Sequence, residues 1–269
     1  MSKKQLPLNM ESIAKSFPTP FHLYDETAIV DNAKELIEAF SWAPNFTNFF
    51  AVKACPNLTI LKLLSSLGFG ADCSSYPELL LAQEAGIPSS KIVLTSNDTP
   101  DEEFLKAYEM GAIINLDDIT HLKTLERVIG HLPKTLCFRF NPGPEREGNV
   151  IIGNPVEAKY GLTREQLYEA YCYAKEKGVK HFGLHTMVAS NELDSSYIVL
   201  TAKMIFDLAI TLKDKLDIDL DFVDFGGGVG IPYKEEDEKI SFKKLGLEIK
   251  ALYEERKLTI PTITFEMGR

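Results

Sequence analysis

Residues 48–96 read NFFAVKACPNLTILKLLSSLGFGADCSSYPELLLAQEAGIPSSKIVLTS, and this stretch decides the fold. It contains three short apolar runs and two intervening segments whose apolar residues recur three and four positions apart. Short apolar runs bounded by turn residues are typical of buried strands, and the intervening spacing is typical of amphipathic helices. Because parallel strands need long crossovers, the stretch predicts parallel strands joined by helices.

The same alternation continues along the rest of the chain. Eight strands are predicted, at 48–54, 68–74, 91–97, 112–118, 136–142, 181–187, 221–228 and 263–269. Segments with helical spacing lie between most of them, at 58–64, 76–85, 101–110, 164–177 and 196–216. Eight evenly spaced units predict an α/β fold, a TIM (β/α)8 barrel of parallel strands, with an open doubly wound sheet as the alternative.

Polar residues lie where the predicted strands end. In a TIM barrel, functional residues gather at the carboxyl ends of the strands. The residues found there are Lys53, Asp72, Ser74, Asn97, Arg139, Asn141, His185, Gly226 to Gly228, Glu266 and Arg269. The proline- and glycine-rich stretch at 142–161 predicts a long loop above the same face. We therefore expect a site at this face with a mobile cover.

Composition narrows the class of ligand. The chain has 269 residues, 45% of them hydrophobic, and a formal net charge of -10. Such a charge disfavours nucleic acid and anionic membranes, so a small-molecule ligand is expected. The sequence contains neither about 20 continuous apolar residues nor the apolar core of a signal peptide, which favours the cytoplasm. Its four cysteines form no CxxC pair, which predicts buried free thiols and no metal site.

Three motifs suggest a phosphate-bearing aldehyde as the ligand. Lys53 ends an apolar strand, where desolvation would lower its pKa and free the amine to form an imine; a lysine at the barrel rim is the alternative. Gly226 to Gly228 would let backbone amides approach an anion, or form only a turn. Arg269 could bind phosphate and Glu266 a heterocyclic nitrogen, unless the two form a rim salt bridge.

With these motifs in this order, the sequence resembles the barrel domain of the fold-type III pyridoxal-phosphate decarboxylases, which act on diaminopimelate, ornithine or arginine. The resemblance covers nearly the whole chain, through TPFHLYD, FFAVKACPN, GFGADCSSYPELLLAQEAG, RFNPG, KYGL, GLHTMVAS, DFGGGVGIPY and EMGR. It implies pyridoxal 5'-phosphate as cofactor and carboxy-lyase activity. It also implies a homodimer in the full-length form.

The resemblance assigns roles by position. Lys53 matches the lysine that holds the cofactor, and Glu266 matches the acid on the pyridine nitrogen, which favours decarboxylation over racemisation. The remaining cofactor-binding positions are Asp72, Arg139, His185, Met187, Ser190, Gly226, Gly227, Gly228, Gly268 and Arg269. Lys53 is the single residue predicted to be catalytic.

Two positions depart from the pattern of the family. Relatives usually read HIGS where this chain has Met187 to Ser190, so Met187 replaces a histidine that stacks on the cofactor ring. A thioether can still pack on a ring, and His185 could serve in part or simply form a local hydrogen bond inside the barrel. Met267 stands where relatives usually have proline.

The resemblance also sets expectations for the ends of the chain. Residues 1–25 are expected to lead into a cofactor-binding barrel at 26–269, which stops after the eighth strand. The carboxyl-terminal β domain of the family is expected to be missing, so we expect weak cofactor binding and little turnover from this chain alone. The favoured reaction is decarboxylation of meso-diaminopimelate to lysine. Alternatives are arginine or carboxynorspermidine decarboxylation, a non-catalytic cofactor-binding protein, and a barrel used only for interaction.

Overall fold

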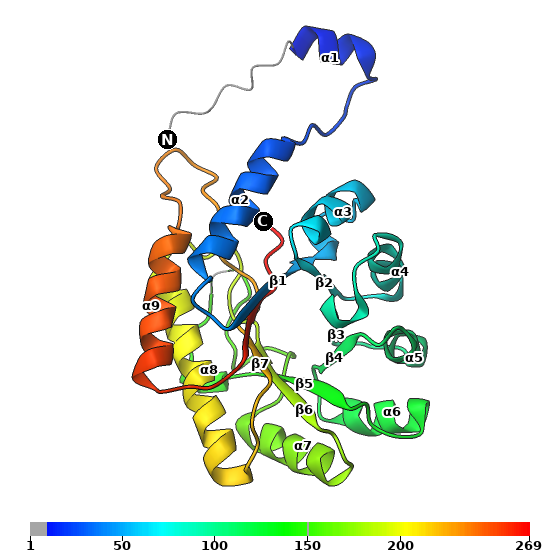
Figure 1. Ribbon diagram of the computed structural model, residues 1–269, viewed down its shortest axis with the longest axis vertical. Helices are drawn as coiled ribbons and strands as arrows, with labels where there is room; N and C mark the ends of the chain where they lie inside the picture. Colours follow the sequence, from blue (N-terminus) through cyan, green and yellow to red (C-terminus); the bar gives the residue numbers. More distant parts are fainter. Residues whose placement is uncertain (1–9, 150) are drawn as a thin grey trace.

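The computed structural model describes residues 10–149 and 151–269 and contains one closed barrel of eight parallel strands (Figure 1). Neighbours in the barrel follow the order of the chain, and β1 closes the ring by pairing with β8. The strands are β1 (Asn45–Ala51), β2 (Gly70–Cys73), β3 (Ile92–Ser96), β4 (Ile113–Leu116), β5 (Thr135–Phe140), β6 (His181–Thr186), β7 (Phe222–Asp224) and β8 (Thr262–Phe265). The predicted barrel is confirmed, and the open sheet is excluded.

Helices surround the barrel and cover its outer face (Figure 1). They are α2 (Glu26–Ala39), α3 (Leu58–Ser66), α4 (Tyr76–Glu84), α5 (Asp101–Met110), α6 (Thr120–Ile129), α7 (Arg164–Glu176), α8 (Ser195–Leu216) and α9 (Phe242–Glu255). A short helix, α1 (Met10–Ser16), precedes α2 and has no buried residue, and Figure 1 shows it away from the barrel. Residues 1–9 of the predicted leading segment lie outside the described part.

Two glycines leave space for the lowest layer of side chains inside the barrel. A Cβ atom at Gly70 would overlap the ring of Phe49, and one at Gly183 would overlap the ring of Phe222. Large side chains from alternate strands can then fill the interior in layers, as in other TIM barrels. Side chains alternate along a strand, so residues two positions after these glycines, Asp72 and His185, point into the same interior. The next layer of the interior is therefore polar.

The long helix α8 is the one described helix that is long and apolar enough to cross a membrane by length and composition. Its buried residues face the barrel, and it packs against α7, α9 and β6. Lys203 and Asp207 form an ion pair on its exposed side. These contacts are those of a core helix that covers a barrel strand.

Some predictions are corrected by the structure. The prediction of buried thiols holds for Cys73 and Cys137, whereas Cys55 is partly buried and Cys172 is exposed on α7; all four are free. Cys172 faces solvent because the buried positions of that helix are Leu167, Ala170, Tyr171 and Ala174. The helices α2, α6 and α9 were not predicted from the sequence, although each buries an apolar face, for example Leu122 and Leu125 in α6.

Candidate active site

A cavity of about 860 Å³ opens at the carboxyl ends of the strands. The residues that line it come from every strand end except that of β4, and from the loop between β5 and α7. They are Ala51, Lys53, Ala54, Asp72, Ser74, Thr95, Ser96, Asn97, Arg139, Ile151, Ile152, Tyr160, His185, Met187, Ser190, Gly228, Val229, Tyr233, Glu266, Met267, Gly268 and Arg269. The predicted face is therefore the one that carries the cavity.

Lys53 lies just past β1, on a short 3-10 turn (Val52–Ala54), rather than at the end of the strand. Its Nζ donates to Asp72 Oδ2 at 3.3 Å and to Ser74 Oγ at 3.2 Å, and its side chain is 59% exposed. Burial lowers the pKa of Lys53, but the carboxyl groups of Asp72 and Glu266 outweigh this and raise it overall. The predicted lowering of this pKa is wrong, because carboxyl groups rather than apolar side chains surround the amine.

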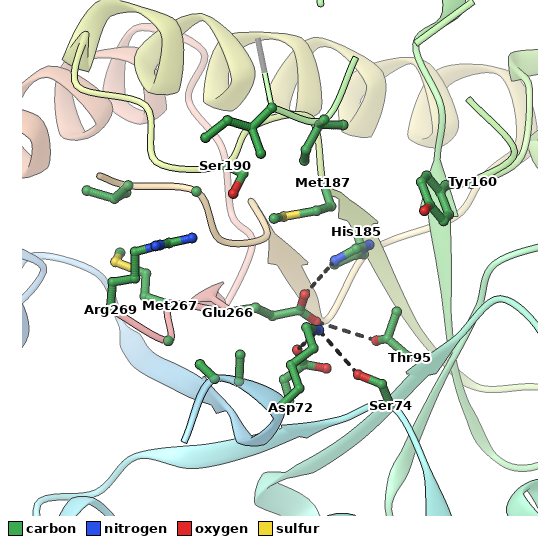
Figure 2. Close-up of a pocket in the computed structure, with 18 of the residues that line it drawn as sticks. Asp72, Ser74, Thr95, Tyr160, His185, Met187, Ser190, Glu266, Met267 and Arg269 are labelled. Carbon is green, nitrogen blue, oxygen red and sulfur yellow. Dashed lines mark hydrogen bonds and ion pairs between the residues drawn. The ribbon is translucent and has the colours of Figure 1, made fainter. Parts of the chain in front are cut away.

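Glu266 is buried in the cavity floor, where His185 and Thr95 hold it (Figure 2). Its Oε2 lies 2.9 Å from His185 Nε2, and its Oε1 accepts from Thr95 Oγ1 at 3.5 Å. Arg269 instead donates to Tyr233 Oη at 2.7 Å, so the alternative of a rim salt bridge with Glu266 is excluded. Both Glu266 and Arg269 line the cavity.

The end of β8 is fixed to β1 by one buried side chain. Asn48 donates through Nδ2 to the carbonyl of Met267 at 3.2 Å, and its Oδ1 accepts from the Met267 amide at 3.0 Å. This paired contact orients the chain immediately after β8. It thereby holds Glu266 toward the interior, and Asn48 is a positioning residue that was not predicted from the sequence.

Carboxyl groups crowd the floor of the cavity. Burial, together with the nearby charge of Glu266, raises the pKa of Asp72 to about 7. Burial likewise raises the pKa of Asp224 and of Glu266 to about 7. Burial lowers the pKa of His185 to about 4, so its imidazole is neutral near pH 7. The floor is therefore suited to a ligand that brings a positive charge or a hydrogen-bond donor.

Arg139 forms one wall of the cavity together with Asp117. Its Nη1 donates to Asp117 Oδ1 at 2.7 Å, and its guanidinium lies 4.8 Å from the ring centroid of Tyr160. Asp117 follows β4, the one strand end at which no polar residue was predicted. The signal was present in the run INLDD, because Asp117 lies two positions after Asn115 on the same strand face.

The glycine turn after β7 differs in part from the prediction. Gly228 lines the cavity, whereas Gly226 and Gly227 do not. The Gly226 amide donates to Asp224 Oδ1 at 2.7 Å, and the Gly227 amide donates to Met187 Sδ at 3.1 Å. Gly226 has a φ of +68° and a Cβ there would overlap the carbonyl of Thr186, so no other residue fits this turn.

Asn141 is another predicted strand-end residue that does not line the cavity. Its side chain accepts from the Gly143 amide at 2.9 Å and donates to the Ala158 carbonyl at 3.4 Å. These bonds hold the two ends of the loop at 142–161 together. Ile151, Ile152 and Tyr160 of this loop line the cavity, which agrees with the predicted cover; Val150 lies outside the described residues.

The residues present fit a phosphate-bearing pyridine aldehyde. Asp72 Oδ1 and His185 Nδ1 are buried and have no hydrogen-bond partner in the described part of the chain. Lys53 provides an amine, and Glu266 provides an acid deep in the same cavity. Arg269 and Gly228 provide guanidinium and backbone donors at the rim, and Figure 2 shows Arg269 and Tyr160 on opposite sides of Glu266.

The fold and the residues of this cavity indicate the class of protein, a TIM barrel that binds an aldehyde cofactor. Residues 27–269 match the family described as pyridoxal-dependent decarboxylase, pyridoxal binding domain. The chain belongs to this family, and its cofactor is pyridoxal phosphate.

Curated relatives support the same family. The chain is 34% identical over its full length to Protein TabA of Pseudomonas amygdali pv. tabaci, and covers 63% of that protein. It is 30% identical over 266 residues to diaminopimelate decarboxylase of Methanothermobacter thermautotrophicus, with 96% of this chain and 61% of that protein covered. The chain thus spans about three-fifths of the length of these relatives.

Solved structures show the same barrel. Diaminopimelate decarboxylase from M. jannaschii superposes with a TM-score of 0.86 at 28% identity, over 95% of this chain and 62% of that one. The Helicobacter pylori enzyme complexed with L-lysine superposes with a TM-score of 0.85 at 29% identity, over 96% of this chain and 66% of that one. The fold around the cavity is therefore that of known decarboxylases.

Proposed function

We propose that this chain is the cofactor-binding barrel of an amino-acid decarboxylase that converts meso-diaminopimelate to L-lysine. One observation carries the proposal: an amine at Lys53 and a buried acid at Glu266 share one cavity. The first can hold an aldehyde cofactor, and the second can hold a proton at a ring nitrogen. Relatives named diaminopimelate decarboxylase support the choice of substrate, whereas TabA shows that the family has other members.

Each of these residues has a separate proposed role in the reaction. Pyridoxal phosphate, when bound, supplies an electron sink for the negative charge left when carbon dioxide departs. Lys53 would hold the cofactor through its Nζ, and the same Nζ, when free, would hold or move a proton. Asp72 and Ser74 accept hydrogen bonds from this Nζ and orient it.

The remaining proposed contacts hold the cofactor in place. Glu266, oriented by His185, would keep a proton at the pyridine nitrogen. Arg269 and Gly228 would bind the phosphate, Gly226 and Gly227 would shape the turn that carries Gly228, and Gly268 lines the same cavity beside Arg269. Met187, Ser190 and Arg139 line the walls, and the Met187 thioether would pack against the cofactor. We also propose a cytoplasmic location and a homodimer of the whole protein.

The test is a decarboxylation assay on two proteins: this chain, and this chain joined to the carboxyl-terminal part of the Methanothermobacter relative. Each is supplied with pyridoxal phosphate and one carboxyl-labelled substrate, and labelled carbon dioxide and the amine product are measured. We expect lysine from meso-diaminopimelate with the joined protein and little with the chain alone. A Lys53→Arg variant keeps the charge and should release no carbon dioxide.

Other results would overturn parts of the proposal. Preferred release from arginine or carboxynorspermidine would overturn the substrate. If the cofactor attaches to Lys53 but no substrate is decarboxylated, the protein is a non-catalytic cofactor carrier. If the cofactor does not attach at all, a barrel used for interaction becomes the better account.

A further inference from the structure

Asn149 belongs to the loop at 142–161, which is called the cover loop below. It makes contacts that have no part in the cofactor site described above. It is buried, with 7% of its surface exposed. Its Oδ1 accepts from the amides of Ile151 at 3.0 Å, Ile152 at 3.4 Å and Ser190 at 3.3 Å. One carboxamide oxygen therefore contacts the loop after β5 and the loop after β6 together, and all three amide donors belong to residues that line the cavity.

The nitrogen of the same carboxamide reaches a carboxylate. Asn149 Nδ2 donates to Glu192 Oε2 at 2.8 Å, and Glu192 Oε1 accepts from the Asp194 amide at 3.0 Å. Asp194 caps the start of α8 through the Ser196 amide. Both oxygens of Glu192 are therefore occupied, one by the cover loop and one by the start of a core helix.

The backbone of Glu192 is anchored to the glycine turn after β7. Its amide donates to the Gly228 carbonyl at 2.7 Å, and its carbonyl accepts from the Gly230 amide at 2.8 Å. Asn191 adds a contact from the same loop, since its Oδ1 accepts from the Ile231 amide at 3.1 Å. Three loops, from β5, β6 and β7, meet at the contact between Asn149 and Glu192.

We propose that Asn149 and Glu192 are positioning residues that hold the cover loop closed over the cofactor cavity. The pair places Ile151 and Ile152 as an apolar wall and fixes the Ser190 backbone beside the ligand. The inference rests on the proposed cofactor site only for its effect on affinity, because the hydrogen bonds exist without a ligand. A substrate would then contact methyl groups, rather than a charge, on this side of the cavity.

The pair allows a reciprocal exchange as a test. Asn149→Asp keeps the acceptor for the three amides but places two carboxylates against each other. Glu192→Gln alone leaves a side chain that can accept from only one of its two present donors. Combining the two changes restores both contacts: the nitrogen of the new glutamine donates to the new aspartate, and the oxygen of that glutamine accepts from the Asp194 amide.

The measurements are the dissociation constant for pyridoxal phosphate and the amide exchange rates of Ile151, Ile152 and Ser190 by NMR, with and without the cofactor. We expect Asn149→Asp to speed exchange at all three amides and to weaken cofactor binding about 5- to 20-fold, and the double variant to return to within about twofold of the parent. The melting temperature of each variant shows whether the barrel itself is intact.

Unchanged exchange in Asn149→Asp, or a double variant as impaired as Asn149→Asp, would overturn the proposal. Because exchange is also measured without cofactor, a failure of the cofactor assignment leaves the test of the pair intact. If Asn149→Asp does not fold, the comparison of the double variant with Glu192→Gln decides: recovery beyond Glu192→Gln supports the pair, and no recovery overturns it.

Discussion

His185 Nε2 lies 2.9 Å from Glu266 Oε2, and the two side chains are only 1% and 6% exposed. Burial lowers the pKa of His185 to about 4, so the imidazole is neutral near pH 7 and cannot balance a charge on Glu266. With its proton on Nε2, the imidazole would donate to Glu266 and Nδ1 would be unprotonated. This agrees with the absence of a hydrogen-bond partner for Nδ1 in the described residues. The acid in the cavity floor is thus held in place without being neutralised by its neighbour.

The first prediction concerns Glu266→Gln and pH. Burial raises the pKa of Glu266 to about 7, above its unfolded value, so the folded state binds this proton more tightly and loses stability as pH rises toward 7. Glutamine removes this loss. In cofactor-free protein, the free energy of unfolding of the variant relative to the parent should therefore increase between pH 5 and pH 8, by about 1 to 3 kcal/mol. Urea unfolding at the two pH values measures it, and a difference that does not change with pH would contradict the shifted pKa.

The second prediction concerns the amine. Asp72 raises the pKa of Lys53 through its charge and a hydrogen bond, against the lowering effect of burial. Asp72→Asn should therefore increase the neutral fraction of the amine and speed attachment of pyridoxal phosphate several-fold at neutral pH. Ser74→Ala is the matched control, since it removes a hydrogen bond from Lys53 but no charge. Equal rates in Asp72→Asn and Ser74→Ala would show that the charge of Asp72 does not control the amine.

The third prediction concerns Met187 and the glycine turn. The Gly227 amide donates to Met187 Sδ at 3.1 Å, so Met187→Leu should free this amide for a phosphate oxygen. One hydrogen bond contributes about 0.5 to 1.5 kcal/mol, so the ratio of affinities for pyridoxal phosphate and pyridoxal should rise about threefold. The ratio cancels changes in contact with the ring. Titrations with both compounds measure it, and a ratio that falls would show that the thioether helps phosphate binding.

The sequence could predict the barrel because each strand carries its own signal. Apolar runs and helical spacing are local, and they place Lys53, Asp72, Arg139, His185, Glu266 and Arg269 at one face. The direction of the shift in the pKa of Lys53 could not be predicted, since it depends on Asp72 and Glu266, which come from other strands. The contact between Asn48 and Met267 likewise joins residues 219 positions apart.

The glycine turn is a second feature that could be predicted only in part from the sequence. Its sequence predicts a turn that can approach an anion, but two of its amides are used by Asp224 and Met187. Those partners lie on the turn's own strand and just after β6, and only the fold brings Met187 to Gly227. Side-chain partners across the barrel are therefore the part of the site that sequence patterns do not specify.

The fourth prediction concerns the packing of Gly183 against Phe222 inside the barrel. A Cβ atom at Gly183 would overlap the Phe222 ring, and this ring is buried on β7, between β6 and β8. Gly183→Ala should therefore lower the free energy of unfolding by about 1 to 3 kcal/mol, as is usual for overpacked cores. Adding Phe222→Leu should recover part of this loss. Chemical denaturation of both variants measures the effect, and an unchanged stability for Gly183→Ala would contradict the packing described.

The attachment of pyridoxal phosphate to Lys53 tests the central claim most directly. The purified chain is mixed with the cofactor, reduced with borohydride and digested, and the modified lysine is identified by mass spectrometry. We predict an absorbance band near roughly 420 nm that reduction removes, with the mass of the cofactor on Lys53 and none in Lys53→Arg. A label spread over surface lysines, or no label on Lys53 at saturating cofactor, would contradict it.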